Sequence, residues 1–218
     1  MNAAPSPATR STGKPIIAPY ITAWSAEVDP PATVVEIPGF GIGYADEQAI
    51  DRGRSGILWA RSSWHPGEGR PEFKRVHPIR QRRAMRNLLC QVCGGPADRT
   101  DDGVLWLLRD YRNDWQGWPN RMSATEPPIC QPCVHLSVKL CPALRRGAAV
   151  IRARRYPIAA VRGCLYTGRR FPKPTRDVTV CLNDRAVRWV KAVNLVRELQ
   201  DCTLIEVSDV PAGPMEGA

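Results

Sequence analysis

Four cysteines, arranged as two Cys-x-x-Cys pairs, are the side chains in this sequence best suited to chemistry. Cys90 and Cys93 form the first pair, Cys130 and Cys133 form the second, and 36 residues lie between the pairs. Two thiolate pairs with this spacing are typical of a tetrahedral zinc site. Four thiolates close the coordination sphere and leave no position for a reacting water. The sequence therefore predicts a structural Zn²⁺ ion and not a catalytic one.

The residues around each pair predict two different local structures. Gly94 directly follows Cys93, and a glycine there permits the tight turn of a zinc knuckle. Residues 104–108 predict a strand between the two pairs. Pro132, inside the second pair, suits the first turn of a helix. The apolar residues that follow recur at every second position, which fits a strand, so a helix and a strand both remain open there.

A knuckle, a hairpin and a helix that carries the last two ligands resemble the treble-clef zinc finger, over roughly residues 87–147. The resemblance implies that Cys90, Cys93, Cys130 and Cys133 are the zinc ligands. The wider pattern CQVCGGPADR…GVLWLL…PPICQPC…CPALRRG is similar to a family of proteins from high-GC bacteria and their mobile elements. That family implies no activity, so the second resemblance adds nothing about function.

The remaining four cysteines do not form pairs, and each has a leucine close by. We expect them to be buried and to pack as small apolar side chains. A second metal site, assembled by the fold from these residues, remains the alternative. The four are Cys141, Cys164, Cys181 and Cys202.

Treble-clef modules also occur in nucleases of the HNH type, which carry a histidine general base on the hairpin between the pairs. No histidine occurs from residue 94 to residue 129, and His135 follows the last ligand. A histidine placed to activate water for phosphodiester hydrolysis is therefore missing. We expect no enzymatic activity, and an HNH-like nuclease remains the less favoured alternative. His65 and His77 each precede a proline and are predicted to be turn residues.

The net charge of +10 is concentrated in two blocks on either side of the cysteine pairs. Residues 70–86 hold seven basic residues and one acidic residue, whereas residues 139–176 hold eleven basic residues and no acidic one. A high-GC codon bias explains arginine in place of lysine, but it does not explain 38 residues without an acid. Clustered charge of one sign is what binding to a polyanion requires.

These blocks predict a zinc-stabilised protein that binds nucleic acid, either DNA or RNA, mainly through its phosphates. Arginine suits this role because its guanidinium group forms bidentate contacts with phosphate and stacks on flat groups. The residues expected to contact nucleic acid are Arg80, Arg82, Arg83, Arg86, Arg145, Arg146, Arg152, Arg154, Arg155, Arg169 and Arg170.

The alternative function is a protein-interaction module, in which zinc only stabilises the fold and an acidic protein is the partner. The loop of residues 111–119 is relevant to this alternative because it contains Trp115 and Trp118. Either the two tryptophans form an exposed tip that docks a partner, or they fold back over a small core.

Short apolar segments bounded by glycine and proline predict an α+β fold built on small antiparallel sheets. A helix is expected from Pro78 to about Leu89. A second, amphipathic helix is expected from Asp184 to Gln200, capped by Asn183 and packed on a sheet. Strands are expected at residues 33–37, 42–45, 57–61, 150–155, 158–166, 178–182 and 203–207.

The sequence also bears on where the protein is located. No apolar run approaches the roughly 20 residues that span a bilayer, and residues 1–13 lack the apolar core of a secretory signal. We therefore expect a cytoplasmic protein with reduced thiols and no membrane partner.

Composition divides the chain into five regions. They are a disordered tail (1–18), a β-rich segment (19–69), a basic helix with the zinc module (70–147), a basic α/β segment (148–210) and a second tail (211–218).

Overall fold

The computed structural model describes residues 17–53 and 56–212, and most of its regular secondary structure is antiparallel β-sheet. The predicted tails at 1–18 and 211–218 lie almost wholly outside the described residues. Within the described residues, no helix is long and apolar enough to cross a membrane. The strands are β1 (Thr22–Trp24), β2 (Val34–Ile37), β3 (Gly41–Tyr44), β4 (Pro71–Val76), β5 (Arg99–Thr100), β6 (Gly103–Arg109), β7 (Met122–Ala124), β8 (Ala148–Arg155), β9 (Ile158–Thr167), β10 (Lys173–Cys181) and β11 (Val190–Ile205). The helices are α1 (Ala49–Arg52), α2 (Pro78–Asn87) and α3 (Gln131–Leu140), with 3₁₀ turns η2 (Leu144–Arg146), η3 (Arg185–Trp189) and η4 (Val207–Asp209).

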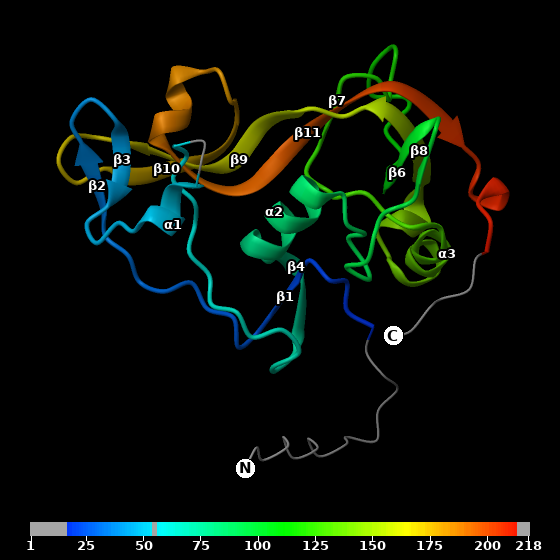
Figure 1. Ribbon diagram of the computed structural model, residues 1–218, viewed down its shortest axis with the longest axis horizontal. Helices are drawn as coiled ribbons and strands as arrows, with labels where there is room; N and C mark the ends of the chain where they lie inside the picture. Colours follow the sequence, from blue (N-terminus) through cyan, green and yellow to red (C-terminus); the bar gives the residue numbers. More distant parts are fainter. Residues whose placement is uncertain (1–16, 54–55, 213–218) are drawn as a thin grey trace.

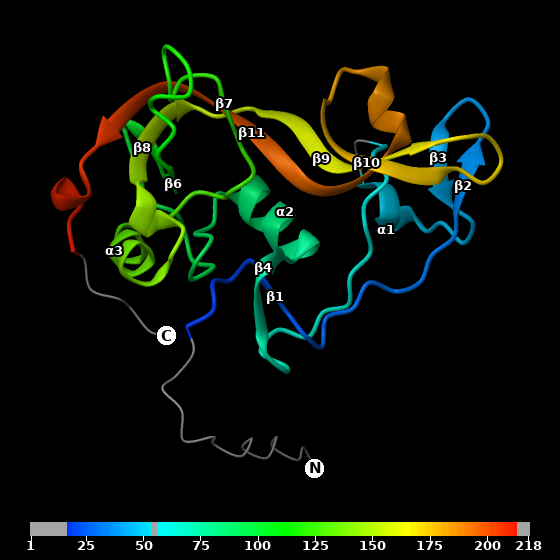
Figure 2. The ribbon, with the colours of Figure 1, turned by 180° about the vertical axis from the view of Figure 1, so that it is seen from behind.

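A curled seven-stranded sheet forms the frame of the molecule and arches over α2 (Figure 1). Its strand order is β10-β9-β11-β8-β6-β5, and β7 pairs with β11. Strand β11 is long enough to pair with β9 through its first half and with β8 through its last residues. It therefore joins the end of the molecule that carries β9 and β10 to the end that carries α3, as the view from behind also shows (Figure 2).

The predicted helix at residues 184–200 is wrong, because this segment forms the short turn η3 and then strand β11. Asp184, not Asn183, caps the turn by accepting a hydrogen bond from the Ala186 N–H group at 2.8 Å. The strand is irregular, with register shifts between Ala192 and Asn194 and between Val196 and Arg197. Each bulge shifts the alternation of buried residues by one position, so the apolar spacing imitates a helix.

The two faces of the sheet bury different apolar side chains in strands β6 and β8. Val104, Trp106 and Leu108 belong to one core, which also includes Trp118 from the loop before β7. Leu105 and Leu107 point to the opposite face and pack with the cysteine pairs and α3. This strict alternation is that of a strand covered on both sides, so the segment that carries the cysteine pairs packs directly on the sheet.

A third core, centred on Met85 of α2, lies under the concave side of the sheet. Gln81 also binds α2 to β11, because its side-chain amide donates to the Leu195 carbonyl at 2.9 Å and accepts from the Leu195 N–H group at 3.0 Å. Arg197 donates to the Met85 carbonyl from Nη2 at 2.7 Å. Helix α2 is thus fixed to β11 by hydrogen bonds as well as by packing.

The amino-terminal region contributes two small pairs of strands. Strands β2 and β3 form the predicted antiparallel hairpin, and β1 pairs with β4 at the amino end of α2. The strand expected at residues 57–61 is reduced to a single bridge between Trp59 and Ala192. The other predicted strands of the carboxyl-terminal half are present, although 203–207 is the end of β11 and not a separate strand.

Candidate metal centre and arginine groove

The four cysteines of the two pairs meet at one point, and their sulfur atoms all lie within 4.8 Å of one another. The Cys93 and Cys130 sulfur atoms are 3.7 Å apart. Four sulfurs at a Zn–S bond length of about 2.3 Å around a tetrahedral ion would lie about 3.8 Å from each other. The cluster therefore fits a four-thiolate metal ion such as Zn²⁺, as the spacing predicts.

A tight turn after α2 presents the first pair. The Gly94 N–H group donates to the Cys90 carbonyl at 2.9 Å, and the Val92 N–H group points at the Cys90 sulfur at 3.4 Å. Gly94 has φ +75°, and an added Cβ there would lie 2.8 Å from the ring of Tyr20. Glycine is thus required both by the backbone conformation and by the neighbouring side chain.

The second pair opens α3, which resolves the choice between helix and strand in favour of the helix. Cys130 is the N-cap residue and Pro132 lies in the first turn. Cys133 and Val134 are buried against the sheet, so the helix turns its apolar side inward. The Cys130 and Cys133 thiolates would lie at the helix amino end, where free N–H groups stabilise negative charge.

Repulsion between neighbouring thiolates favours the binding of a cation in this cluster. A hydrogen bond from Cys133 lowers the pKa of the Cys90 thiol to about 5, and the same bond raises the pKa of Cys133. Burial, together with the charge on Cys90, raises the pKa of Cys130 to about 12. One thiolate thus suppresses ionisation of its neighbours, and a divalent cation supplies the charge that lets all four ionise.

The remaining cysteines do not contribute to this cluster. Cys181 is exposed, contrary to the expectation of burial, whereas Cys141, Cys164 and Cys202 are half-buried. Among the described residues, the only group of three or more potential ligands is the cluster of the two pairs. His135 lies on α3 and its Nε2 is 2.8 Å from the Val210 carbonyl, so this nitrogen has a backbone partner.

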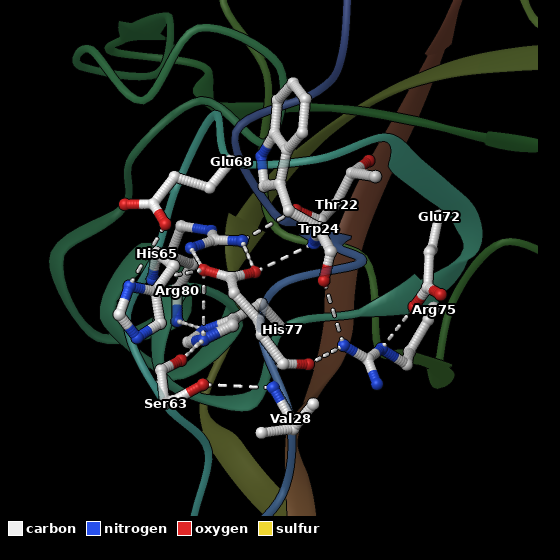
Figure 3. A network of polar contacts seen from close by, with 11 residues as sticks. Thr22, Trp24, Val28, Ser63, His65, Glu68, Glu72, Arg75, His77 and Arg80 are labelled. Atoms are coloured by element: carbon white, nitrogen blue, oxygen red, sulfur yellow. Dashed lines mark hydrogen bonds and ion pairs between the residues drawn. The ribbon is translucent and has the colours of Figure 1, made fainter.

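A buried ion pair holds the amino end of α2 to the segment after β1. The Glu27 carboxylate accepts two hydrogen bonds from the Arg80 guanidinium, each 2.6 Å long, and Arg80 also donates to the Thr22 carbonyl at 2.7 Å. The Trp24 N–H group donates to Glu27 at 2.9 Å. Figure 3 shows how these groups converge around Arg80 and His77. Burial alone would raise the pKa of Glu27, but these donors outweigh it and lower the pKa to about 2.

His77 is part of the same network. The sequence predicts it to be a turn residue, and this prediction is wrong because His77 is the residue that caps the amino end of α2. It is fully buried as the N-cap of α2, where its Nδ1 accepts from the Arg80 N–H group at 3.3 Å. Its Nε2 lies 2.9 Å from the Ser63 carbonyl, so this nitrogen carries the proton. Burial lowers the pKa of His77, and the Arg80 charge contributes to the same shift. His77 is therefore a neutral structural residue.

Four of the eleven arginines expected to bind nucleic acid are paired with carboxylates of the chain. Arg80 is buried with Glu27, so it is not available at the surface and its assignment as a phosphate contact is corrected. The other three lie on β8. Their pairs are Arg152 with Asp98, Arg154 with Asp102 and Arg155 with Asp201.

The other seven arginines form no ion pair among the described residues, and they lie in three places. Arg145 and Arg146 belong to η2, which follows α3 at one end of the molecule. Arg169 and Arg170 lie in the turn between β9 and β10 at the other end. These seven arginines therefore do not share one surface. The remaining three, on α2, are Arg82, Arg83 and Arg86.

The three α2 arginines line a groove of about 650 Å³ between this helix and the segments 48–53 and 59–62. Trp59 is buried at its base, and the Arg82 and Arg86 guanidinium carbons lie 4.4 Å and 5.8 Å from the Trp59 ring centroid. Burial, with the charge of Arg86, lowers the pKa of Arg82 to about 10. Arg82 is still charged at neutral pH, and its charge has no anionic partner in the described chain.

The chain matches no family model, no curated protein and no solved structure. Spacing alone predicts the cysteine cluster. The groove cannot be predicted in this way, because Trp59 and the other lining residues that precede α2 carry no sequence signal that places them beside this helix. The spacing of Arg82 and Arg86, four residues apart on one helix, is the part of that signal present in the sequence.

Proposed function

We propose that this chain is a zinc-stabilised nucleic-acid-binding protein with a treble-clef-like metal module. The observation that carries the proposal is the set of three arginines on α2, which share one groove and have no carboxylate partner among the described residues. Arginines held in place by stacking are well suited to bind phosphate groups. The zinc ion would stabilise the fold, and the arginines would supply the affinity.

The metal module supports this proposal indirectly. It follows α2 with only Leu88 and Leu89 between the helix and Cys90, so the metal centre would fix the carboxyl end of the arginine helix. The order of a knuckle, the hairpin β5–β6 and helix α3 is the order that the treble-clef resemblance implies. Strand β6 also pairs with β8, so the module extends into the main sheet.

An electrophoretic mobility-shift series at rising salt tests the proposal. Because phosphate neutralisation releases counterions, binding should weaken steeply between 50 and 200 mM salt, by about 10-fold or more even for a few phosphate contacts. Single-stranded and duplex DNA and RNA should all be included. Absence of a shift with all of them at low salt would rule out nucleic-acid binding as the function.

A protein-interaction module is the second candidate, and two exposed aromatic side chains favour it. Phe40 in the β2–β3 turn is 69% exposed, and Phe171 in the β9–β10 turn is 61% exposed. Both turns lie at the same end of the molecule (Figure 1). An apolar pair at one end suits contact with another protein, and this candidate gains support if no nucleic acid binds.

A further inference from the structure

The groove beside α2 has two unlike walls. Arg82, Arg83 and Arg86 form the basic wall. The opposite side carries Ile50 of α1 and the ion pair of Asp51 with Arg61. Ile50 is 82% exposed, although it is a large apolar residue. Because Arg61 neutralises Asp51, the groove keeps the positive charge of the α2 arginines, with one exposed apolar side chain across from them. This combination suits a ligand that has both an anionic group and an apolar one. A nucleotide has this character, since its phosphate is charged and its base is flat and apolar on both faces.

The arginines of this wall are held in place before any ligand arrives. Arg82 and Arg86 lie over the ring of Trp59, which restricts the guanidinium groups while their N–H edges remain available. The backbone of α2 is itself fixed to β11 through Gln81. A preorganised set of donors loses little conformational entropy on binding, so these residues are suited to contact a phosphodiester directly.

The surroundings of α2 exclude the way in which a helix reads duplex DNA. A recognition helix must project far enough to enter a major groove about 12 Å wide. Here the sheet arches over α2, and the segments 48–53 and 59–62 flank it (Figure 1). Gln81, Ala84 and Met85 are buried, and only a narrow strip of the helix, including Arg83 and Arg86, is exposed. A single strand does not require the helix to project, because its phosphates and bases can both reach a shallow groove.

We propose that the groove between α2 and the segments 48–53 and 59–62 is a binding site for single-stranded nucleic acid, with the α2 arginines on its phosphates and Ile50 against a base. This inference rests on the proposed function and names the kind of nucleic acid that the protein takes. It places the specific contacts at the centre of the molecule. The arginines of η2 and of the β9–β10 turn would add only non-specific attraction.

Fluorescence anisotropy with one labelled 12-nucleotide strand, and the same strand in a duplex, tests the site at a fixed salt concentration. The wild-type protein should bind the single strand at least 10-fold more tightly than the duplex. The double variant Arg82→Met/Arg86→Gln should weaken single-strand binding at least 10-fold. It should also reduce the slope of log K against log salt by about 1.4, because two phosphate contacts are lost. The matched control, Arg145→Gln/Arg146→Gln, removes the same charge outside the groove and should weaken binding less than 3-fold.

A second variant tests the groove without touching a buried side chain. Ile50→Glu adds a negative charge at the exposed rim and should weaken single-strand binding, whereas Leu140→Glu, on the half-exposed end of α3, should not. Equal effects of the groove and control variants, or duplex binding as tight as single-strand binding, would overturn the site while leaving nucleic-acid binding intact. Absence of binding to any nucleic acid would instead overturn the proposed function.

Discussion

The Glu27 carboxylate and the Arg80 guanidinium are joined by two hydrogen bonds of 2.6 Å, and neither side chain is accessible to solvent beyond 2%. This pair fixes the amino end of α2, and the four-cysteine cluster follows its carboxyl end. Between these two anchors the helix presents Arg82, Arg83 and Arg86 to the groove. The predictions below test each anchor and then the groove.

Removal of one partner of the buried pair should be strongly destabilising, because the other charge is left buried without compensation. We expect Glu27→Gln and Arg80→Met each to lower the free energy of unfolding by about 3–5 kcal/mol. The double variant should lose clearly less than the sum of the two, since no isolated charge remains. Urea denaturation measures all three. A loss below 1 kcal/mol in either single variant would contradict the pairing.

The same network predicts that the protein becomes less stable in acid, in two steps. His77 has a lowered pKa in the folded state, so the unfolded chain takes up a proton first as the pH falls below about 6.5. Glu27 has a pKa of about 2 against an ordinary value of 4.5, so its contribution is lost as the pH falls from about 4.5 towards 2. Urea unfolding from pH 7.5 to pH 3 measures both steps. His77→Gln should flatten only the first.

The metal centre should hold one Zn²⁺ per chain and stabilise residues 87–147. Metal analysis of the purified protein should give one zinc, and Cys90→Ser/Cys130→Ser should give none. The variant should lose hydrogen-exchange protection over α3, and its melting temperature should fall by about 10 °C or more. The control Cys181→Ser, which changes an exposed cysteine outside the cluster, should keep both the zinc and the stability.

Replacement of Arg82 should weaken nucleic-acid binding without lowering the stability of the fold. Its charge is half-buried without an anionic partner among the described residues, so replacement with an apolar side chain of similar length should not destabilise the fold. We expect Arg82→Met to have a melting temperature equal to or above that of the wild type, and to bind nucleic acid several-fold more weakly. A variant that melts well below the wild type would show that Arg82 is a structural residue.

The part of the molecule that could be predicted from sequence is the part specified by local spacing. The two cysteine pairs, helix α2 and the β2–β3 hairpin are each specified by residues that are near one another in the chain. The structure confirms the helix and the hairpin, and it brings the four cysteines together at distances that fit a metal ion. The buried pair of Glu27 and Arg80 could not be predicted, since 53 residues separate them and neither lies in a motif.

Strand β11 shows a second reason why sequence analysis can fail. Val187 in the turn η3 and the β11 valines at 190, 193 and 196 recur every third residue and imitate one face of a helix. They are β-branched and favour a strand, however, and the bulge after Ala192 absorbs the mismatch with the period of two. The choice was decided by pairing with β9 and β8, which are contacts made across the chain.

Nucleic-acid binding before and after zinc removal tests the central claim most directly. The metal-loaded protein should bind a labelled single strand at 50 mM salt. Chelation should abolish this binding because the carboxyl end of α2 loses its anchor, and stoichiometric Zn²⁺ should restore it. Absence of binding by the metal-loaded protein, or unchanged affinity after complete loss of zinc, would contradict the account.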